Sequence, residues 1–97
     1  LGGEPLLEEV GEPPIHRIAW CTGAAQSYID RAAELGVDAY LSGEVSEPTI
    51  HSAREQGLHY IAAGHHATER YGVRALGAKL AETLGIEHQF IDVDNPA

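Results

Sequence analysis

The chain has 97 residues, of which 43% are hydrophobic, so a single small domain with a packed core is expected. Fifteen acidic residues against six basic ones give a net charge of −9, which disfavours binding to nucleic acid and to anionic membrane surfaces. A single cysteine, Cys21, excludes an intrachain disulfide, and no apolar run reaches the roughly 18 residues of a membrane span, so we expect a cytoplasmic protein.

The beginning of the chain suggests a piece of a longer protein. The sequence contains no methionine and starts with a leucine, so we expect a fragment. Residues 1–14 are rich in Gly, Pro and Glu, a composition typical of a linker or of the tail of a preceding element. The remaining residues, 15–97, form one α/β unit by the following pattern.

Short apolar runs alternate with segments of helical spacing from residue 15 onward. Glycines that suit the end of a helix follow the helical segments. Strands alternating with helices across short turns predict right-handed βαβ units and a mostly parallel sheet of βαβαβαβ order. The expected strands are residues 15–20, 37–42, 58–63 and 88–93, and the expected helices are residues 27–35, 46–56 and 66–84.

Three turns of this pattern carry the polar chemistry. They are CTG after the first strand, SGE after the second and GHH after the third. The carboxyl ends of parallel strands meet at one edge of a sheet, which is where open α/β folds bind their ligands. The sequence therefore predicts one functional rim.

His65 and Glu69 stand one helical turn apart at this rim. At about 100° of rotation per residue, Glu69 lies roughly 40° from His65. Both residues continue an apolar stripe, which we expect to face the core. An ionised carboxylate on a buried stripe needs a cation, a proton or strong donors. The stripe consists of Val73, Leu76 and Leu80.

A divalent metal ion would satisfy both His65 and Glu69, because ligands at positions i and i+4 share one helix face. The alternatives are a plain hydrogen bond between the two side chains at the helix start, or a histidine packed against the sheet. Two ligands are also too few for a metal site, and the chain offers no convincing third.

Glu44 and His66 are the candidates for handling protons. Glu44 follows Gly43 at the second strand end, where its candidate roles are general base, water holder or substrate contact; the alternative is that it caps the N-terminus of the next helix or favours it by its charge. His66 points about 100° away from its neighbour on a helix, which makes it a supporting group or a surface residue.

The stretches IAWCTGAAQSYID, GVDAYLSGEVSEPTIHSAREQGLHYIAAGHHATER and FIDVDNPA resemble the carboxyl-terminal half of the NIF-three-like family. This family is also labelled dinuclear metal centre protein or GTP cyclohydrolase 1 type 2 homologue. The resemblance covers nearly the whole chain. It implies one α/β half of a two-lobed fold, with two divalent metal ions in the cleft between the halves and with His65 and Glu69 as metal ligands.

The resemblance also implies the partners and the chemistry. The remaining metal ligands belong to an amino-terminal half that these 97 residues lack, and the complete protein resembles a ring-shaped homohexamer. The implied activity is that of a metal-dependent hydrolase of the GTP cyclohydrolase type. The alternative is a non-catalytic metal-binding or scaffold protein. Histidine with carboxylate suits Zn, Mn, Fe, Co or Ni.

Overall fold

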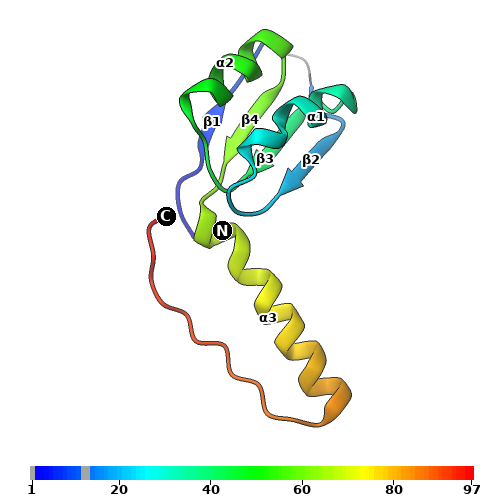
Figure 1. Cartoon of the computed structure of the whole chain (residues 1–97), viewed down its shortest axis with the longest axis vertical. Coiled ribbons are helices and arrows are strands. Elements are labelled where there is room, and N and C mark those ends of the chain that lie inside the picture. Colours follow the sequence, from blue (N-terminus) through cyan, green and yellow to red (C-terminus); the bar gives the residue numbers. More distant parts are fainter. Residues whose placement is uncertain (1, 12–13) are drawn as a thin grey trace.

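A four-stranded sheet forms the centre of the domain in the computed structural model, which describes residues 2–11 and 14–97 (Figure 1). The strands follow the spatial order β1-β4-β3-β2. β2 pairs with β3, and β3 with β4, in parallel, whereas β1 pairs with β4 antiparallel. The expected α/β fold with a mostly parallel sheet is confirmed. The strands are β1 (Leu6–Glu8), β2 (Ile18–Cys21), β3 (Ala39–Ser42) and β4 (His59–Ala62).

Two of the helices, α1 and α2, cover one face of this sheet (Figure 1). The short 3-10 helix η1 leads into α1, and the pair corresponds to the helix expected at residues 27–35. In α2, Ser46 and Thr49 exchange hydrogen bonds in a capping box, and Gly57 ends the helix in the left-handed conformation. The bounds are η1 (Gln26–Tyr28), α1 (Ile29–Glu34), α2 (Glu47–Gln56) and α3 (His65–Leu84).

The core lies between the sheet and these two helices. Tyr40 and Tyr60 are register partners on neighbouring strands, and their rings meet edge to face with centroids 5.8 Å apart. Ile29 and Ala32 of α1 and Ala53 of α2 pack against them, and all five residues are buried. The core therefore anchors β3 and β4, whose carboxyl ends carry the polar rim.

The expectation of a strand at residues 88–93 is wrong. These residues belong to no strand. The fourth strand of the sheet is instead β1, within the Gly-, Pro- and Glu-rich beginning of the chain. Residues 86–97, which we call the return segment, run back along α3 toward its first turn (Figure 1). HQFIDV has the composition of a strand, but strand pairing needs a neighbouring edge, and none lies beside it in the described part of the chain.

The expectation that the apolar stripe of α3 faces the core is also wrong. α3 runs away from the sheet after its first turn, and its single buried residue among those described is Thr68 (Figure 1). Val73 is 62% exposed and Leu76 is 59% exposed. None of the helices in the described ranges combines the length and apolarity needed to cross a membrane.

Candidate functional site

The three loops that follow β2, β3 and β4 are joined through their glycines. The N–H of Gly43 donates to the carbonyl of Gly23 at 2.9 Å, and the N–H of Gly64 donates to the carbonyl of Gly43 at 3.0 Å. A Cβ atom at Gly43 would lie only 2.9 Å from both the Cα and the N of Gly23, so a side chain has no space there. The predicted meeting of the three turns at one rim is confirmed, and their spacing is set by main-chain contacts.

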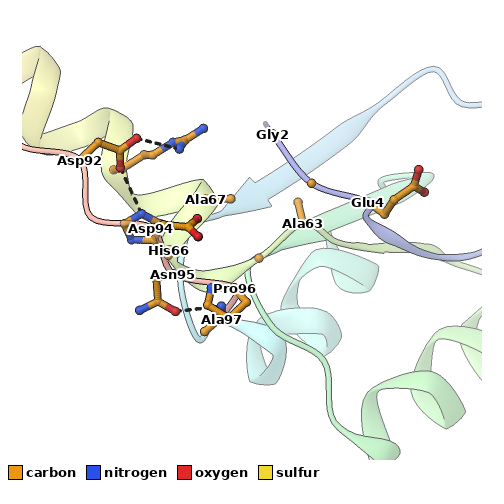
Figure 2. Close-up of a pocket in the computed structure, with 13 residues that line it drawn as sticks. Gly2, Glu4, Ala63, His66, Ala67, Asp92, Asp94, Asn95, Pro96 and Ala97 are labelled. Atoms are coloured by element: carbon orange, nitrogen blue, oxygen red, sulfur yellow. Dashed lines mark hydrogen bonds and ion pairs between the residues drawn. The ribbon is translucent and has the colours of Figure 1, made fainter.

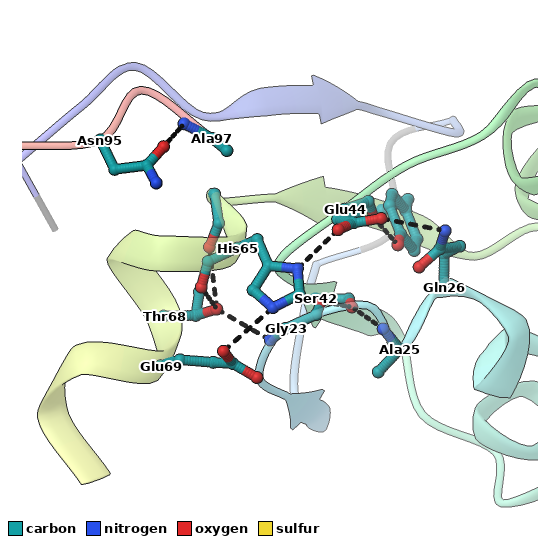
Figure 3. A network of polar contacts seen from close by, with 12 residues as sticks. Gly23, Ala25, Gln26, Ser42, Glu44, His65, Thr68, Glu69, Asn95 and Ala97 are labelled. Atoms are coloured by element: carbon teal, nitrogen blue, oxygen red, sulfur yellow. Dashed lines mark hydrogen bonds and ion pairs between the residues drawn. The ribbon is translucent and has the colours of Figure 1, made fainter. Parts of the chain in front are cut away.

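His65 lies between two carboxylates at this rim (Figure 3). Its Nδ1 is 2.5 Å from Oε1 of Glu44, and its Nε2 is 3.0 Å from Oε2 of Glu69. About one third of the His65 side chain is exposed, and about half of that of Glu69. The sequence predicted that His65 and Glu69 share a helix face, which the structure confirms, but not that Glu44 contacts the opposite ring nitrogen.

The contact between His65 and Glu44 shifts the pKa of both groups. The hydrogen bond to Glu44 is the largest cause that raises the pKa of His65, and the charges of Glu69 and Glu44 add to it. The pKa of Glu44 is lowered, mainly by its hydrogen bond to His65. Both carboxylates therefore favour the protonated form of the His65 imidazole.

Glu44 is held in place by two further contacts. Its Oε2 is 3.5 Å from Nε2 of Gln26, and its main-chain carbonyl accepts a hydrogen bond from the hydroxyl of the buried Tyr60 at 2.5 Å. The N-cap of α2 is Ser46, so the carboxylate of Glu44 is directed to His65 and does not cap that helix. Neither Gln26 nor Tyr60 was singled out from the sequence, where no motif marks them.

The first turn of α3 is tied to the loop after β2. The buried hydroxyl of Thr68 accepts a hydrogen bond from the N–H of Gly23 at 3.0 Å and donates to the carbonyl of Gly64 at 2.8 Å. Gly23 has a φ of +72°, and a Cβ atom added there would overlap Oε1 of Glu69. The side chain of Glu69 therefore lies directly over Gly23. Thr68 was also missed from the sequence, although its place one turn after Gly64 is a signal for such a back-bond.

His66 points away from this cluster. Its Nε2 is 3.5 Å from Oδ1 of Asp92, and its N–H donates to the carbonyl of Ala97 at 3.0 Å. Figure 2 shows it beside the end of the return segment. There it lines a cavity of about 370 Å³, and it also lines the cavity that reaches His65 and Glu69. Its divergence from His65 fits the expected rotation on a helix, and a role in proton transfer remains a prediction.

No group of three His, Cys, Asp or Glu side chains in the described ranges is arranged to hold a metal ion. The reason lies in the geometry of His65, whose two ring nitrogens point in opposite directions. Glu44 occupies one side and Glu69 the other, so the two carboxylates do not converge on one point.

Fold and rim together define an open α/β domain with a polar site at the carboxyl ends of its parallel strands. The chain belongs to the DUF34/NIF3 (NGG1p interacting factor 3) family, whose model matches residues 4–96. It is 68% identical, over all of its length and 38% of the relative's, to a protein of Pseudomonas aeruginosa called GTP cyclohydrolase 1 type 2 homolog.

Two solved structures extend this likeness to three dimensions. A protein named ybgI, described as of unknown function, is 59% identical and superposes with a TM-score of 0.94 over 99% of this chain and 39% of its own. TTHA1606 from Thermus thermophilus is 28% identical, with a TM-score of 0.85 over 99% of this chain and 38% of its own. The chain thus spans about two fifths of the length of these relatives.

Proposed function

We propose that His65 and Glu69 supply two of the ligands of a divalent metal ion in a metal-dependent hydrolase of the GTP cyclohydrolase 1 type 2 homologue class. The observation that carries this proposal is the separation of 3.0 Å between Nε2 of His65 and Oε2 of Glu69. Two donors that each stand about 2.1 Å from one ion are roughly 3.0–3.4 Å apart, depending on the angle at the metal. The pair therefore fits as two ligands without rearrangement of α3.

Glu44 acts in this proposal as a positioning residue. Its carboxylate accepts a hydrogen bond from the Nδ1–H of His65, so a neutral imidazole keeps its hydrogen on Nδ1 and has a free electron pair on Nε2, on the side of Glu69. Tyr60 and Gln26 keep that carboxylate in place. The pattern of carboxylate, histidine and metal recurs in metal sites, where the carboxylate fixes the tautomer and the ring orientation.

The missing ligands come, in this proposal, from the part of the full-length protein that this chain does not cover. Two ligands do not retain an ion, so we expect the isolated chain to bind metal weakly or not at all. The complete site would hold two divalent ions, with His65 and Glu69 among their ligands, and such ions would supply the activation of water and the polarisation of the substrate that hydrolysis needs. The name that the Pseudomonas relative carries supports a nucleotide such as GTP as the substrate.

A metal count on the full-length protein tests the site. We expect His65→Ala and Glu69→Ala to reduce the metal bound per polypeptide after loading with Mn²⁺, Zn²⁺ or Fe²⁺. His51→Ala is the matched control, because His51 and Glu47 form an exposed His–Glu pair of the same i, i+4 spacing on α2, 3.9 Å apart. Unchanged metal content in both rim variants, or an equal loss in the control, contradicts the proposed site.

Two further measurements refine this test. Glu44→Gln should weaken metal binding by about 10–100-fold if Glu44 orients His65. Turnover of GTP and related nucleotides by the metal-loaded protein, followed by mass spectrometry for the addition of water, tests hydrolysis. If the protein binds its full complement of metal and turns over no nucleotide, the proposed hydrolase activity is contradicted.

The second candidate is a non-catalytic metal-binding or scaffold protein that forms a homohexameric ring. It is favoured by the exposed apolar residues of α3 and of the return segment, which suit contacts with other polypeptides. Metal bound without turnover, together with a hexameric mass of the full-length protein in light scattering, would select this role.

A further inference from the structure

A cavity of about 410 Å³ lies between the beginning of α1 and the beginning of α2. It shares no lining residue with the cavity that reaches His65 and Glu69, so it is a separate place on the molecule. Its volume is in the range of sites that hold small ligands. The polar side chains that line it are those of Gln26, Ser27, Asp30, Ser46, Thr49 and Ser52.

Both walls of this cavity are held by hydrogen bonds to the main chain. On the side of η1, the N–H of the buried Ala25 donates to Oγ of Ser42 at 3.2 Å, and its carbonyl accepts from the hydroxyl of Tyr40 at 2.7 Å. On the side of α2, the N–H of Ser46 donates to Oγ1 of Thr49 at 3.2 Å. The walls are therefore formed before a ligand arrives, which lowers the cost of binding.

Gln26 lines the cavity with an incomplete set of hydrogen bonds. Its Nε2 is 3.5 Å from Oε2 of Glu44, which is a long contact. Its Oε1 is buried and has no hydrogen-bond partner in the described part of the chain. A buried carbonyl oxygen without a donor costs free energy, so a group that donates to it is favoured. A hydroxyl of a ligand in the cavity is such a donor.

The other lining groups select a neutral ligand that carries hydroxyls. Asp30 is the one charged residue among the described lining residues, and its carboxylate repels anions such as phosphate. A single carboxylate is also too little to hold a metal ion. Ser27 and Ser52 add hydroxyls, which both donate and accept hydrogen bonds. A wholly apolar ligand would leave all these groups without partners.

Asp30 is suited to accept a hydrogen bond from a sugar. Its Oδ1 already accepts from Nε2 of Gln56 at 2.8 Å, which holds the carboxylate in place. Acidic side chains accept hydrogen bonds from ribose hydroxyls in the same way in dinucleotide-binding folds. Asp30 and Gln26 thus offer two acceptors on one cavity, which matches two neighbouring hydroxyls.

Gln26 also connects the cavity to the candidate ligand pair. Its amide contacts Glu44, whose other carboxylate oxygen contacts Nδ1 of His65 (Figure 3). The cavity is therefore separated by one side chain from the rim at which the proposed reaction takes place. The proposed nucleotide substrate carries a ribose with two neighbouring hydroxyls beside its base.

We infer that this cavity binds the 2′,3′-diol of a nucleoside, with the 2′-hydroxyl donating to Asp30 and the 3′-hydroxyl donating to Gln26. The inference rests on the proposed function for the choice of a nucleotide, but it requires no metal ion and no hydrolysis. Nucleoside binding measured in the presence of EDTA and metal content measured after loading can therefore fail separately.

The first test compares guanosine with 2′-deoxyguanosine by NMR titration of the isotope-labelled protein in EDTA. We expect guanosine to shift the amides of Gln26, Asp30 and Ser52. We expect 2′-deoxyguanosine to bind at least about 10-fold more weakly, because a hydrogen bond to an ionised carboxylate is lost. Equal affinities of the two nucleosides, or no shifts at these amides, would overturn the inference. Free ribose that binds as tightly as guanosine would contradict the choice of a nucleoside.

Variants of the two acceptors make the test specific to the cavity. Asp30→Asn should weaken guanosine by about 10-fold and abolish the preference over 2′-deoxyguanosine, because the acceptor of the 2′-hydroxyl is removed. Gln26→Ala should weaken both nucleosides alike, because both carry the 3′-hydroxyl. Glu34→Gln is the matched control, since Glu34 is an exposed carboxylate of the same helix that contacts Arg31 at 3.0 Å and does not line the cavity. A preference for guanosine that survives in Asp30→Asn, or that is lost in Glu34→Gln, contradicts the assignment.

Discussion

Replacing Gly23 by alanine tests how the candidate ligand pair is positioned. The backbone of Gly23 has a φ of +72°, and an added Cβ atom would overlap Oε1 of Glu69 and stand 3.0 Å from its Cδ. It would also stand 3.3 Å from Nε2 of His65. Gly57 offers a matched control, because its φ is +66° and a Cβ atom there would meet nothing within 4 Å.

The expected loss of stability in Gly23→Ala has two contributions, one from the backbone conformation and one from the steric overlap. A left-handed conformation costs alanine about 1–2 kcal/mol, and this cost applies to Gly23→Ala and Gly57→Ala alike. The overlap at Gly23 involves the far end of a side chain that is about half exposed, so Glu69 relieves it by turning toward solvent. We therefore expect both variants to lose a similar free energy of unfolding, while Gly23→Ala alone separates Glu69 from His65.

Urea unfolding followed by circular dichroism and NMR titration of the imidazole measure the two effects. The pKa of His65 should be lower than in the wild type in Gly23→Ala and unchanged in Gly57→Ala, because Glu69 is one of the groups that raise it. Identical titration of His65 in the wild type and both variants would show that Glu69 does not lie over Gly23.

The remaining predictions concern the same cluster. Glu44→Gln should lower the pKa of His65 more than Glu69→Gln does, because the bond to Glu44 is the larger cause; NMR titration with the reverse order would contradict this. Since the pKa of His65 is raised in the folded state, its stabilisation is complete below the ordinary imidazole pKa and is lost as the pH rises through the raised value. The wild type should therefore have a higher urea midpoint than His65→Gln at low pH, and this difference should become smaller as the pH rises. A difference that becomes larger as the pH rises would contradict the raised pKa of His65. Tyr60→Phe removes the hydrogen bond to the carbonyl of Glu44 and should cost about 1 kcal/mol in urea unfolding and shift the titration of His65. Tyr40→Phe, which loses a hydrogen bond to the carbonyl of Ala25 instead, should cost a similar amount without that shift.

The order of strands and helices could be read from the sequence because each element carries its own periodicity. The helix expected at residues 66–84 begins at His65 and ends at Leu84, and that expected at 46–56 begins at Glu47. β1 was missed, since only three of its residues are paired and they lie among Gly, Pro and Glu. The predictions of a strand at 88–93 and of a buried stripe on α3 are wrong for another reason. Periodicity shows which side chains form an apolar face, but it does not show whether residues of the same chain bury that face.

The candidate site was predictable to the extent that it depends on local spacing. His65 and Glu69 are one turn apart on a helix, and that spacing alone brings their side chains together. The contact between Glu44 and His65 joins residues 21 positions apart and depends on how far two loops stand from each other. The hydrogen bond of Thr68 to the loop after β2 is likewise a tertiary contact, which no pattern along the chain encodes.

The row of glycines at the rim has a consequence for how the chemistry of this domain can vary. Gly43 donates its N–H to Gly23 and offers its own carbonyl to Gly64, so the three loops keep fixed distances from one another. Replacing Gly43 by any residue with a side chain would place its Cβ atom against the backbone of Gly23, and no change of rotamer can relieve that contact. New specificities can therefore arise only by exchanging the side chains that stand on this fixed frame, and a glutamate shortened to aspartate would fall out of reach of its histidine.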